Sequence, residues 1–200
     1  MSMTLTETHT LILDLSPILK KMSDEDFFEF CRLNRDWRIE ITSEGKLIVR
    51  PMRGGVDGAR NFTLTGIFGI WAKADGTGKG FDSSTGFTLP NGAKRSPDLA
   101  WVELSRWNAL SKEERKKFPP LCPDFVVELR SETDSLDTLK DKMQEYIANG
   151  ARLGWLIDPS EKKVYIYRPQ MEVECLTDPA SVSGDPLLGG FTLDMSEVWD

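Results

Sequence analysis

The chain has 200 residues, of which 40% are hydrophobic and 28% charged, and its formal net charge is −7. This length suits one domain with a core large enough to need no disulfide or structural metal. The sequence contains no run of about eighteen apolar residues and no signal-peptide pattern at its start. We therefore expect a cytoplasmic protein with no membrane span.

Two residue types limit the chemistry that the chain can perform. The single histidine is His9, and the three cysteines (Cys31, Cys122 and Cys175) form no C-x-x-C pair. A Ser-His-Asp triad, a histidine-rich zinc site and a two-histidine iron site all need residues that are scarce here. An odd number of scattered cysteines also argues against a disulfide framework. Any catalysis must therefore use carboxylates, lysines, arginines or tyrosines.

The first elements in chain order are an N-terminal segment and a short helix. Residues 1–22 are interpreted as an arm or an edge strand, and residues 23–200 as a single domain. Ser23 is followed by acidic residues and then by apolar residues at helical spacing. A serine cap with acids in the first turn is typical of a helix N-terminus. The pattern predicts a helix over residues 24–34.

A hairpin and a longer helix are predicted next. Residues 37–41 and 46–50 alternate between apolar and polar side chains around a glycine-containing turn, which is typical of two paired strands. Residues 58–74 carry apolar side chains mostly at helical spacing and are followed by Gly76, a residue that commonly ends helices. Short strands are expected around Phe81 and at 86–89.

The second half of the chain predicts the interior of a sheet. Residues 96–103 and 123–130 have the apolar character of interior strands. Apolar residues on one helical face predict a helix over 134–149, and strands are expected at 153–157 and 164–167. These elements, without a repeat or a low-complexity linker, indicate one α/β domain with a mixed sheet.

Glu128 is an acid within a strand that otherwise consists of buried residue types. Strand alternation places Phe125, Val127 and Leu129 on one face, and Glu128 with Arg130 on the other. A buried carboxylate is unfavourable unless it is paired or binds a metal. An ion pair of Glu128 with Arg130 or with a nearby lysine explains the pattern as well as a metal does.

Asp98 is the second acid at the start of an apolar strand, directly after Pro97. By itself this position is more typical of a turn or cap than of a metal ligand. Together with Glu128, however, it suggests two carboxylates that converge from separate strands. Two carboxylates and water suit Mg²⁺, which can activate water and stabilise charge on a phosphate.

At this point the chain resembles a known family. Ser96-Pro97-Asp98, followed by Pro123-Asp124-Phe125-Val126-Val127-Glu128, resembles the motif of the PD-(D/E)XK nuclease superfamily. More closely, the chain resembles the cyanobacteria-abundant family of that superfamily named as putative restriction endonucleases. The likeness spans roughly residues 20–199 and includes the ordered segments Ile39-Glu40, Gly86-Phe87, Arg95-Ser96-Pro97-Asp98, Glu128-Leu129-Arg130-Ser131 and Trp155-Leu156-Ile157-Asp158-Pro159.

The resemblance implies a fold and a set of site residues. The implied fold is restriction endonuclease-like, a mixed central sheet flanked by helices. Asp98 and Glu128 match metal ligands, and Glu40 matches an earlier acid of the same site. The usual lysine two positions after the second acid is absent, because position 130 is Arg130. Arginine stays protonated and cannot act as a base, but it can steady a phosphate.

A lysine on the following helix substitutes in this family, and Lys142 is the match. On a helical wheel, Lys142 and Lys140 both flank the apolar face, so geometry does not choose between them. For either lysine, the pattern alone favours a surface position from which the side chain extends its charge to the solvent. The choice of Lys142 rests on the resemblance.

Three functions remain open. The first is an endonuclease that uses Mg²⁺, with Mn²⁺ as an alternative, to hydrolyse DNA, and that works as a homodimer through its apolar tail and N-terminal arm. The second is a catalytically inactive nucleic-acid-binding or protein-interaction module, and the third is a hydrolase of smaller phosphate esters. The acidic net charge disfavours DNA, although one basic surface is expected from Lys46, Arg50, Arg53, Lys94 and Arg95.

Overall fold

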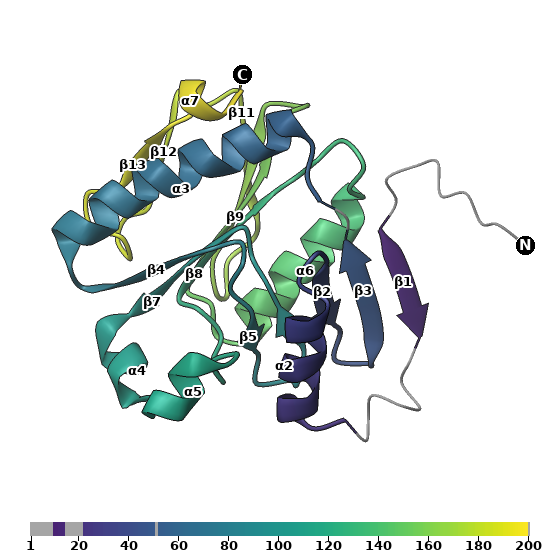
Figure 1. The fold of residues 1–200 in the computed structure, drawn as a ribbon. Coiled ribbons are helices and arrows are strands. Elements are labelled where there is room, and N and C mark those ends of the chain that lie inside the picture. The colour runs from purple at the N-terminus through teal and green to yellow at the C-terminus, as the bar shows by residue number, and fades with distance from the viewer. Residues whose placement is uncertain (1–9, 15–21, 51, 200) are drawn as a thin grey trace, which may run out of the picture.

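The computed structural model describes residues 10–14, 22–50 and 52–199 (Figure 1), and His9 lies outside these ranges. The described helices are α2 (Asp24–Leu33), α3 (Gly55–Asp75), α4 (Leu104–Ala109), α5 (Lys112–Lys116), α6 (Leu136–Ala148) and α7 (Ser196–Trp199). The described strands are β1 (Leu11–Asp14), β2 (Arg38–Ile41), β3 (Lys46–Arg50), β4 (Gly78–Asp82), β5 (Phe87–Thr88), β6 (Lys94–Arg95), β7 (Leu99–Glu103), β8 (Phe125–Leu129), β9 (Leu153–Asp158), β10 (Lys163–Tyr167), β11 (Glu174–Thr177), β12 (Ser181–Ser183) and β13 (Thr192–Asp194).

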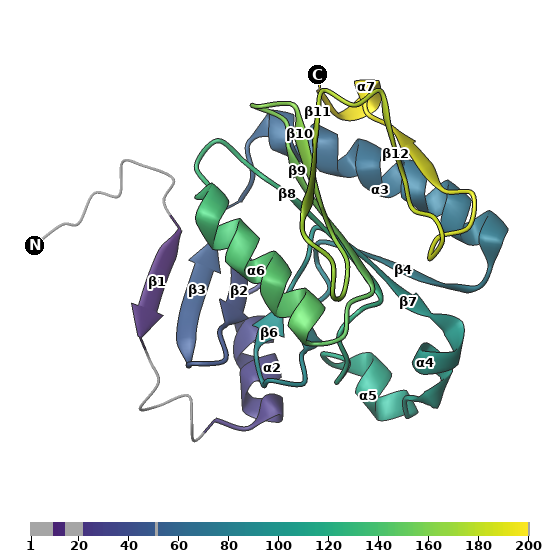
Figure 2. The same ribbon diagram turned by 180° about the vertical axis from the view of Figure 1, so that it is seen from behind.

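The central sheet has six strands in the order β11-β10-β9-β8-β7-β4. The pairing of β8 with β9 is parallel, and the other pairings in this sheet are antiparallel. Helices α3 and α6 lie on opposite faces of this sheet, as the two opposite views show (Figures 1 and 2). The predicted α/β class, with a mixed central sheet flanked by helices, is therefore confirmed.

Strand alternation divides the apolar residues of β8 between two cores. Phe125, Val127 and Leu129 belong to the core that α3 covers, and Val126 belongs to the core that α6 covers. This confirms the predicted assignment of faces, because side chains one residue apart in a strand point to opposite sides of the sheet. Glu128 therefore faces α6.

Serine caps mark the start of three described helices. Ser23 and Ser111 each form a capping box at the start of α2 and α5, and Ser135 caps α6. Gly76 adopts a left-handed conformation after α3, which only glycine adopts at no steric cost. Helix α3 begins three residues before the predicted start at residue 58, because its first turn contains glycines rather than a periodic apolar pattern.

A second sheet, which the sequence analysis did not anticipate, has the order β1-β3-β2-β6-β5. Its centre is the predicted hairpin β2–β3, and β1 pairs antiparallel with β3 at one edge. The edge-strand interpretation is thus confirmed for residues 11–14. The remaining residues expected in the N-terminal arm lie mostly outside the described ranges. The second sheet lies beside α6 (Figures 1 and 2), which brings β2 toward Glu128.

The apolar tail is part of the core of this chain. Leu188, Phe191, Leu193 and Val198 are buried, and they pack with residues of α3 and β9 in one cluster. These four side chains therefore serve the internal core, and the expected role of the tail in a homodimer stays a prediction. In the described ranges, no helix has the length and apolar character needed to cross a membrane.

Candidate functional site

Asp98 and Glu128 lie next to each other on adjacent strands. The β7–β8 register pairs Leu99 with Val127, and continuing it by one residue places Asp98 opposite Glu128. Two hydrogen bonds hold Asp98 there, from its own N–H to the Val127 carbonyl (2.9 Å) and from the Leu129 N–H to Asp98 Oδ2 (2.8 Å). The convergence of the two acids that the sequence predicts is therefore present at the boundary of β7 and β8.

Glu128 is held from α6 by two side chains. Tyr146 Oη donates a hydrogen bond to Glu128 Oε1 (3.0 Å), and Lys142 Nζ lies 2.8 Å from the same oxygen. The other oxygen, Oε2, is buried and has no hydrogen-bond partner among the described residues. Because a buried carboxylate oxygen without a partner is strongly unfavourable, Oε2 indicates a place where a cation or a donor belongs.

Asp98 is bound by two arginines that the sequence analysis did not assign to it. Arg38 Nη1 lies 3.0 Å from Asp98 Oδ1, and Arg53 Nη2 also contacts this oxygen. Arg38 comes from β2, and Arg53 from the segment that leads into α3. A signal for Arg38 was available, since it shares one face of β2 with Glu40 two residues later.

Glu40 and Lys142 connect the hairpin to α6. Lys142 Nζ lies 2.8 Å from Glu40 Oε1, and the Ser96 N–H also donates to this oxygen (2.9 Å). Arg95 Nη1 lies 3.4 Å from Glu40 Oε2. The exposed fraction of the residue is 1% for Asp98 and Glu128, 2% for Glu40 and 4% for Lys142. The four residues therefore form one buried cluster, as the resemblance implies.

Lys140, the other lysine that the helical wheel allowed, points elsewhere. Its Nζ lies 4.8 Å from the centroid of the Tyr165 ring. The tertiary structure thus brings Lys142, and not Lys140, to the carboxylates. Tyr146, on the same helix, is buried in the core and also contacts Glu128.

Arg130 does not contact these carboxylates in the described structure. Its Nη1 lies 2.6 Å from Asp158 Oδ2, and its Nε donates to the Asp134 carbonyl (3.2 Å). The expected placement of Arg130 beside the reacting phosphate is therefore not supported. Its guanidinium pairs instead with Asp158, a buried carboxylate at the end of the neighbouring strand β9.

Charges around the cluster shift the pKa values of its acids in opposite directions. Burial is the main reason that the pKa of Glu128 is raised; Lys142 opposes this shift, and Asp98 adds to it. Burial also disfavours ionised Glu40, but Lys142 and two arginines outweigh it and hold the pKa of Glu40 well below its usual range. At Asp98, Arg38 and Arg53 outweigh burial and lower the pKa to about 2. Glu128 is consequently the acid whose charge is least compensated.

The donor set fits a hard cation held by two carboxylates. Mg²⁺ takes oxygen ligands and keeps several waters, and Asp98 with the unpartnered Oε2 of Glu128 supplies oxygens from adjacent strands. The oxygens of Glu40 accept from Lys142, Ser96 and Arg95 instead. In the described ranges, no three His, Cys, Asp or Glu side chains are arranged to hold a metal ion. The oxygens of Asp98 likewise accept from Arg38, Arg53 and the Leu129 N–H. Metal binding by Asp98, Glu128 and Glu40 therefore stays a prediction.

Comparisons with known proteins give a family and a fold. Residues 24–196 match the Uma2 family, whose description is "Putative restriction endonuclease". The chain is also similar to the crystal structure of a putative nuclease belonging to DUF820 from Anabaena variabilis. The TM-score is 0.68 at 24% identity, over 80% of this chain and 89% of that chain. This likeness confirms the predicted restriction endonuclease-like fold. No curated protein is significantly similar. Because the family match covers most of its residues, the chain belongs to the Uma2 family of putative restriction endonucleases.

Proposed function

We propose that this protein is a Mg²⁺-dependent endonuclease that hydrolyses phosphodiester bonds in DNA. The observation that carries the proposal is the buried, unpartnered Oε2 of Glu128 opposite Asp98, in a chain of a nuclease family. The acids lie where the strands of the central sheet meet α6 and the hairpin. Mn²⁺ is an alternative ion, because it accepts the same oxygen ligands.

Each residue of the cluster has a distinct proposed role. Asp98 and Glu128 would hold the metal, which when bound supplies an activated water and stabilises charge on the phosphate. Tyr146 orients the Glu128 carboxylate through its hydrogen bond. Lys142 holds Glu40 and Glu128 together and balances their charge, and it would orient or deprotonate the attacking water. Arg130 has no catalytic role in this proposal.

The first test is metal binding, measured by titrating Mg²⁺ and Mn²⁺ in a calorimeter. Wild type should bind either ion, and Glu128→Ala should not, because Oε2 is removed. If neither protein binds metal alone, the titration is repeated with a DNA duplex present. Failure under both conditions would contradict metal-dependent hydrolysis.

The second test is nicking of supercoiled plasmid DNA in the presence of each metal ion. Glu128→Gln and Asp98→Ala should lose cleavage, because each removes a metal ligand. Asp124→Asn is the matched control, since Asp124 is another buried acid directly before β8 but contacts Arg106 and the Glu103 N–H. Cleavage by Glu128→Gln at the wild-type rate would overturn the assignment.

A second candidate is a catalytically inactive nucleic-acid-binding module. It is favoured by Arg130 at the position of the usual lysine and by the two arginines that occupy Asp98 Oδ1. Such a module would bind DNA with an affinity that falls steeply with salt and would show no metal-dependent turnover. The homodimer stays a prediction, which analytical ultracentrifugation with and without DNA would check.

A further inference from the structure

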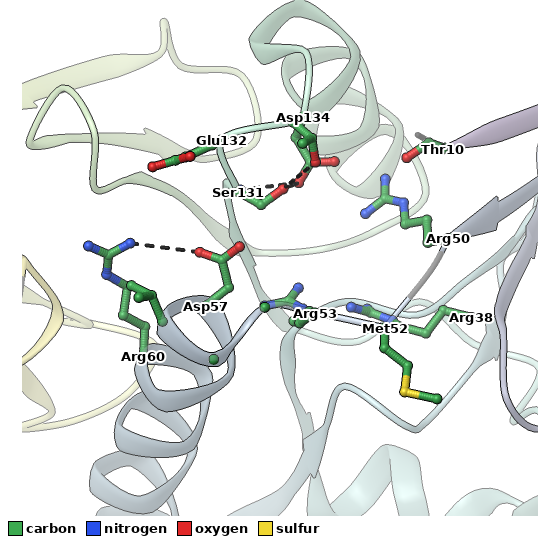
Figure 3. A pocket seen from close by; sticks show the side chains of 14 residues that line it. Thr10, Arg38, Arg50, Met52, Arg53, Asp57, Arg60, Ser131, Glu132 and Asp134 are labelled. Carbon is green, nitrogen blue, oxygen red and sulfur yellow. Dashed lines mark hydrogen bonds and ion pairs between the residues drawn. The ribbon is translucent and has the colours of Figure 1, made fainter. Parts of the chain in front are cut away.

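A pocket with several charged side chains in its lining adjoins the carboxylate cluster on the side of α3. It has a volume of about 370 Å³ and is lined by residues of β2, β3, the start of α3 and the loop 131–134 (Figure 3). Arg38 and Arg53 line this pocket and also contact Asp98. Two of the side chains that line the pocket therefore also contact an acid of the candidate metal site.

Three arginines present unused hydrogen-bond donors here. The nitrogen atoms Arg38 Nε, Arg50 Nε and Arg53 Nη1 are buried and have no hydrogen-bond partner among the described residues. A guanidinium N–H that is removed from water without an acceptor is unfavourable, and charge makes the loss larger. Three such donors from separate segments in one pocket indicate a missing acceptor.

The positions of Arg38 and Arg50 reinforce this conclusion. The two residues lie directly opposite each other in the β2–β3 register. Like charges in this arrangement destabilise an antiparallel pair. Asp98 compensates Arg38, but no described residue forms an ion pair with the Arg50 guanidinium within 4.0 Å. Glu40, Glu128, Asp134 and Asp98 offset the Arg50 charge from farther away, and an anion in the pocket would give this guanidinium a direct partner.

The N-terminus of α3 opens into the same pocket. Its N-cap residue is Gly54, which provides no side-chain acceptor for the first N–H groups of this 21-residue helix. A Cβ built at Gly54 or Gly55 would meet nothing within 4 Å, so a ligand can approach this backbone closely. Helix N-termini favour anions through these free N–H groups and the helix dipole.

The acids in the pocket have partners or lie on the opposite wall. Asp57 pairs with Arg60 (3.7 Å), and Asp134 accepts hydrogen bonds from Ser131. Figure 3 shows Glu132 and Asp134 on the loop that faces the three arginines across the pocket. Among the described residues, Arg38, Arg50 and Arg53 are thus the pocket side chains that still carry hydrogen-bond donors without a partner.

We infer that Arg38, Arg50, Arg53 and the N-terminus of α3 form a binding site for a backbone phosphate of the DNA strand. This inference rests on the proposed function for the source of the phosphate. The chemistry of the site recognises a phosphate group in general, so free phosphate is the competing source. The site would hold the strand beside Asp98 and Glu128 without contributing a metal ligand.

The test measures binding of a fluorescein-labelled DNA duplex by anisotropy in EDTA, so that metal and cleavage play no part. Arg50→Gln should weaken binding about tenfold and reduce the slope of log affinity against log salt by about 0.9, the value expected for one phosphate contact. Arg152→Gln is the control with the same loss of charge, since Arg152 precedes β9 at the opposite end of the sheet from Arg130. Equal binding by the two variants would overturn the inference.

A second pair of variants keeps the test independent of folding. Gly54→Asp and Gly54→Asn both add a favourable N-cap side chain and should not lower the melting temperature. They differ in charge, so Gly54→Asp should bind DNA more weakly than Gly54→Asn if a phosphate lies there. Equal affinities for these two variants would also count against the site.

The remaining outcomes separate the two proposals. If DNA binding depends on Arg50 but no metal ion supports cleavage, the phosphate site is supported and the proposed endonuclease activity is wrong. If Arg50→Gln and Gly54→Asp cleave DNA as fast as wild type, the proposed endonuclease activity stands and the proposed phosphate site is wrong. If inorganic phosphate raises the melting temperature of wild type but not of Arg50→Gln, while DNA binding ignores Arg50, the site serves free phosphate and the DNA assignment is wrong.

Discussion

Glu128 and Asp98 are neighbours across two strands, yet their surroundings differ. Asp98 accepts from two arginines and a backbone N–H, so its ionised form is favoured. Glu128 accepts from Tyr146 and Lys142 on one oxygen, while its other oxygen has no partner in the described structure. Buried carboxylates that lack compensation are typical of functional positions, because selection for stability alone would remove them.

We predict that Glu128→Gln keeps or raises the free energy of unfolding at neutral pH. The pKa of Glu128 is raised by burial, so its charged form destabilises the folded state as the pH rises through that pKa. A neutral isostere removes this effect. Glu40→Gln is the contrasting variant and should lose stability, because Lys142 and Arg95 favour the ionised form of Glu40. Urea unfolding checks both, and a less stable Glu128→Gln would contradict the account.

Asp98→Asn should lose stability in a pH-dependent way. A pKa that falls from 3.8 to about 2 corresponds to about 2 kcal/mol of stabilisation. Because the pKa is depressed in the folded state, this stabilisation is present above pH 3.8 and is lost as the pH falls toward 2. The difference between wild type and variant, from urea unfolding at a series of pH values, should therefore narrow below pH 3.8. A constant difference would show that charge is not the cause.

Helix α6 provides the basic and phenolic side chains of the cluster from one face. Lys142 and Tyr146 are four residues apart and therefore lie on the same side of the helix, next to Met143 in the core. Lys140 lies on the flank toward Tyr165. The helix thus aligns one lysine with Glu40 and Glu128, and it leaves the other near the surface.

Lys142→Met should destabilise the protein by about 3 to 5 kcal/mol, because it leaves two buried carboxylates without their shared cation. Lys140→Met loses only a cation–π contact and should change stability by about 1 kcal/mol or less. Thermal and urea unfolding of the two variants provide the comparison. Similar losses for both would mean that the cluster does not depend on Lys142.

At the scale of the whole molecule, the tail completes the core on the α3 face of the sheet. The Phe191 ring lies 5.1 Å from Phe68, 5.2 Å from Trp71 and 5.9 Å from Trp155, measured between ring centroids. These contacts join the end of the chain to α3 and β9. The tail therefore stabilises the sheet whose opposite face carries the carboxylate cluster.

Phe191→Ala should lower the free energy of unfolding by about 3 to 5 kcal/mol, the usual effect of deleting a buried aromatic side chain. Met171→Ala is the control, because Met171 is largely exposed in a turn. Urea unfolding measures stability, and ultracentrifugation of the same samples measures association. If Phe191→Ala keeps the free energy of unfolding of wild type but associates more weakly, the tail acts as a subunit contact.

Local sequence patterns determined the main elements and the positions of two acids. Capping residues and helical spacing predicted α2 and α6, and period-two alternation placed Glu128 on the face opposite Phe125 and Val127. Such features depend on residues close together in the chain, so a sequence expresses them directly. The acids were notable for the same reason, since Glu128 interrupts one apolar strand and Asp98 stands directly before another.

Only the tertiary structure decided which side chains meet those acids. Lys142 contacts Glu40 across 102 residues of chain, and Arg38 contacts Asp98 across 60. Arg130 turns to Asp158, which belongs to the next strand of the sheet. Ion pairs between distant segments depend on how the second sheet and α6 are placed, and periodicity carries no information about that placement. The sequence therefore predicted which residues belong to the carboxylate cluster, whereas the ion pairs and hydrogen bonds among them depended on the packing of the whole domain.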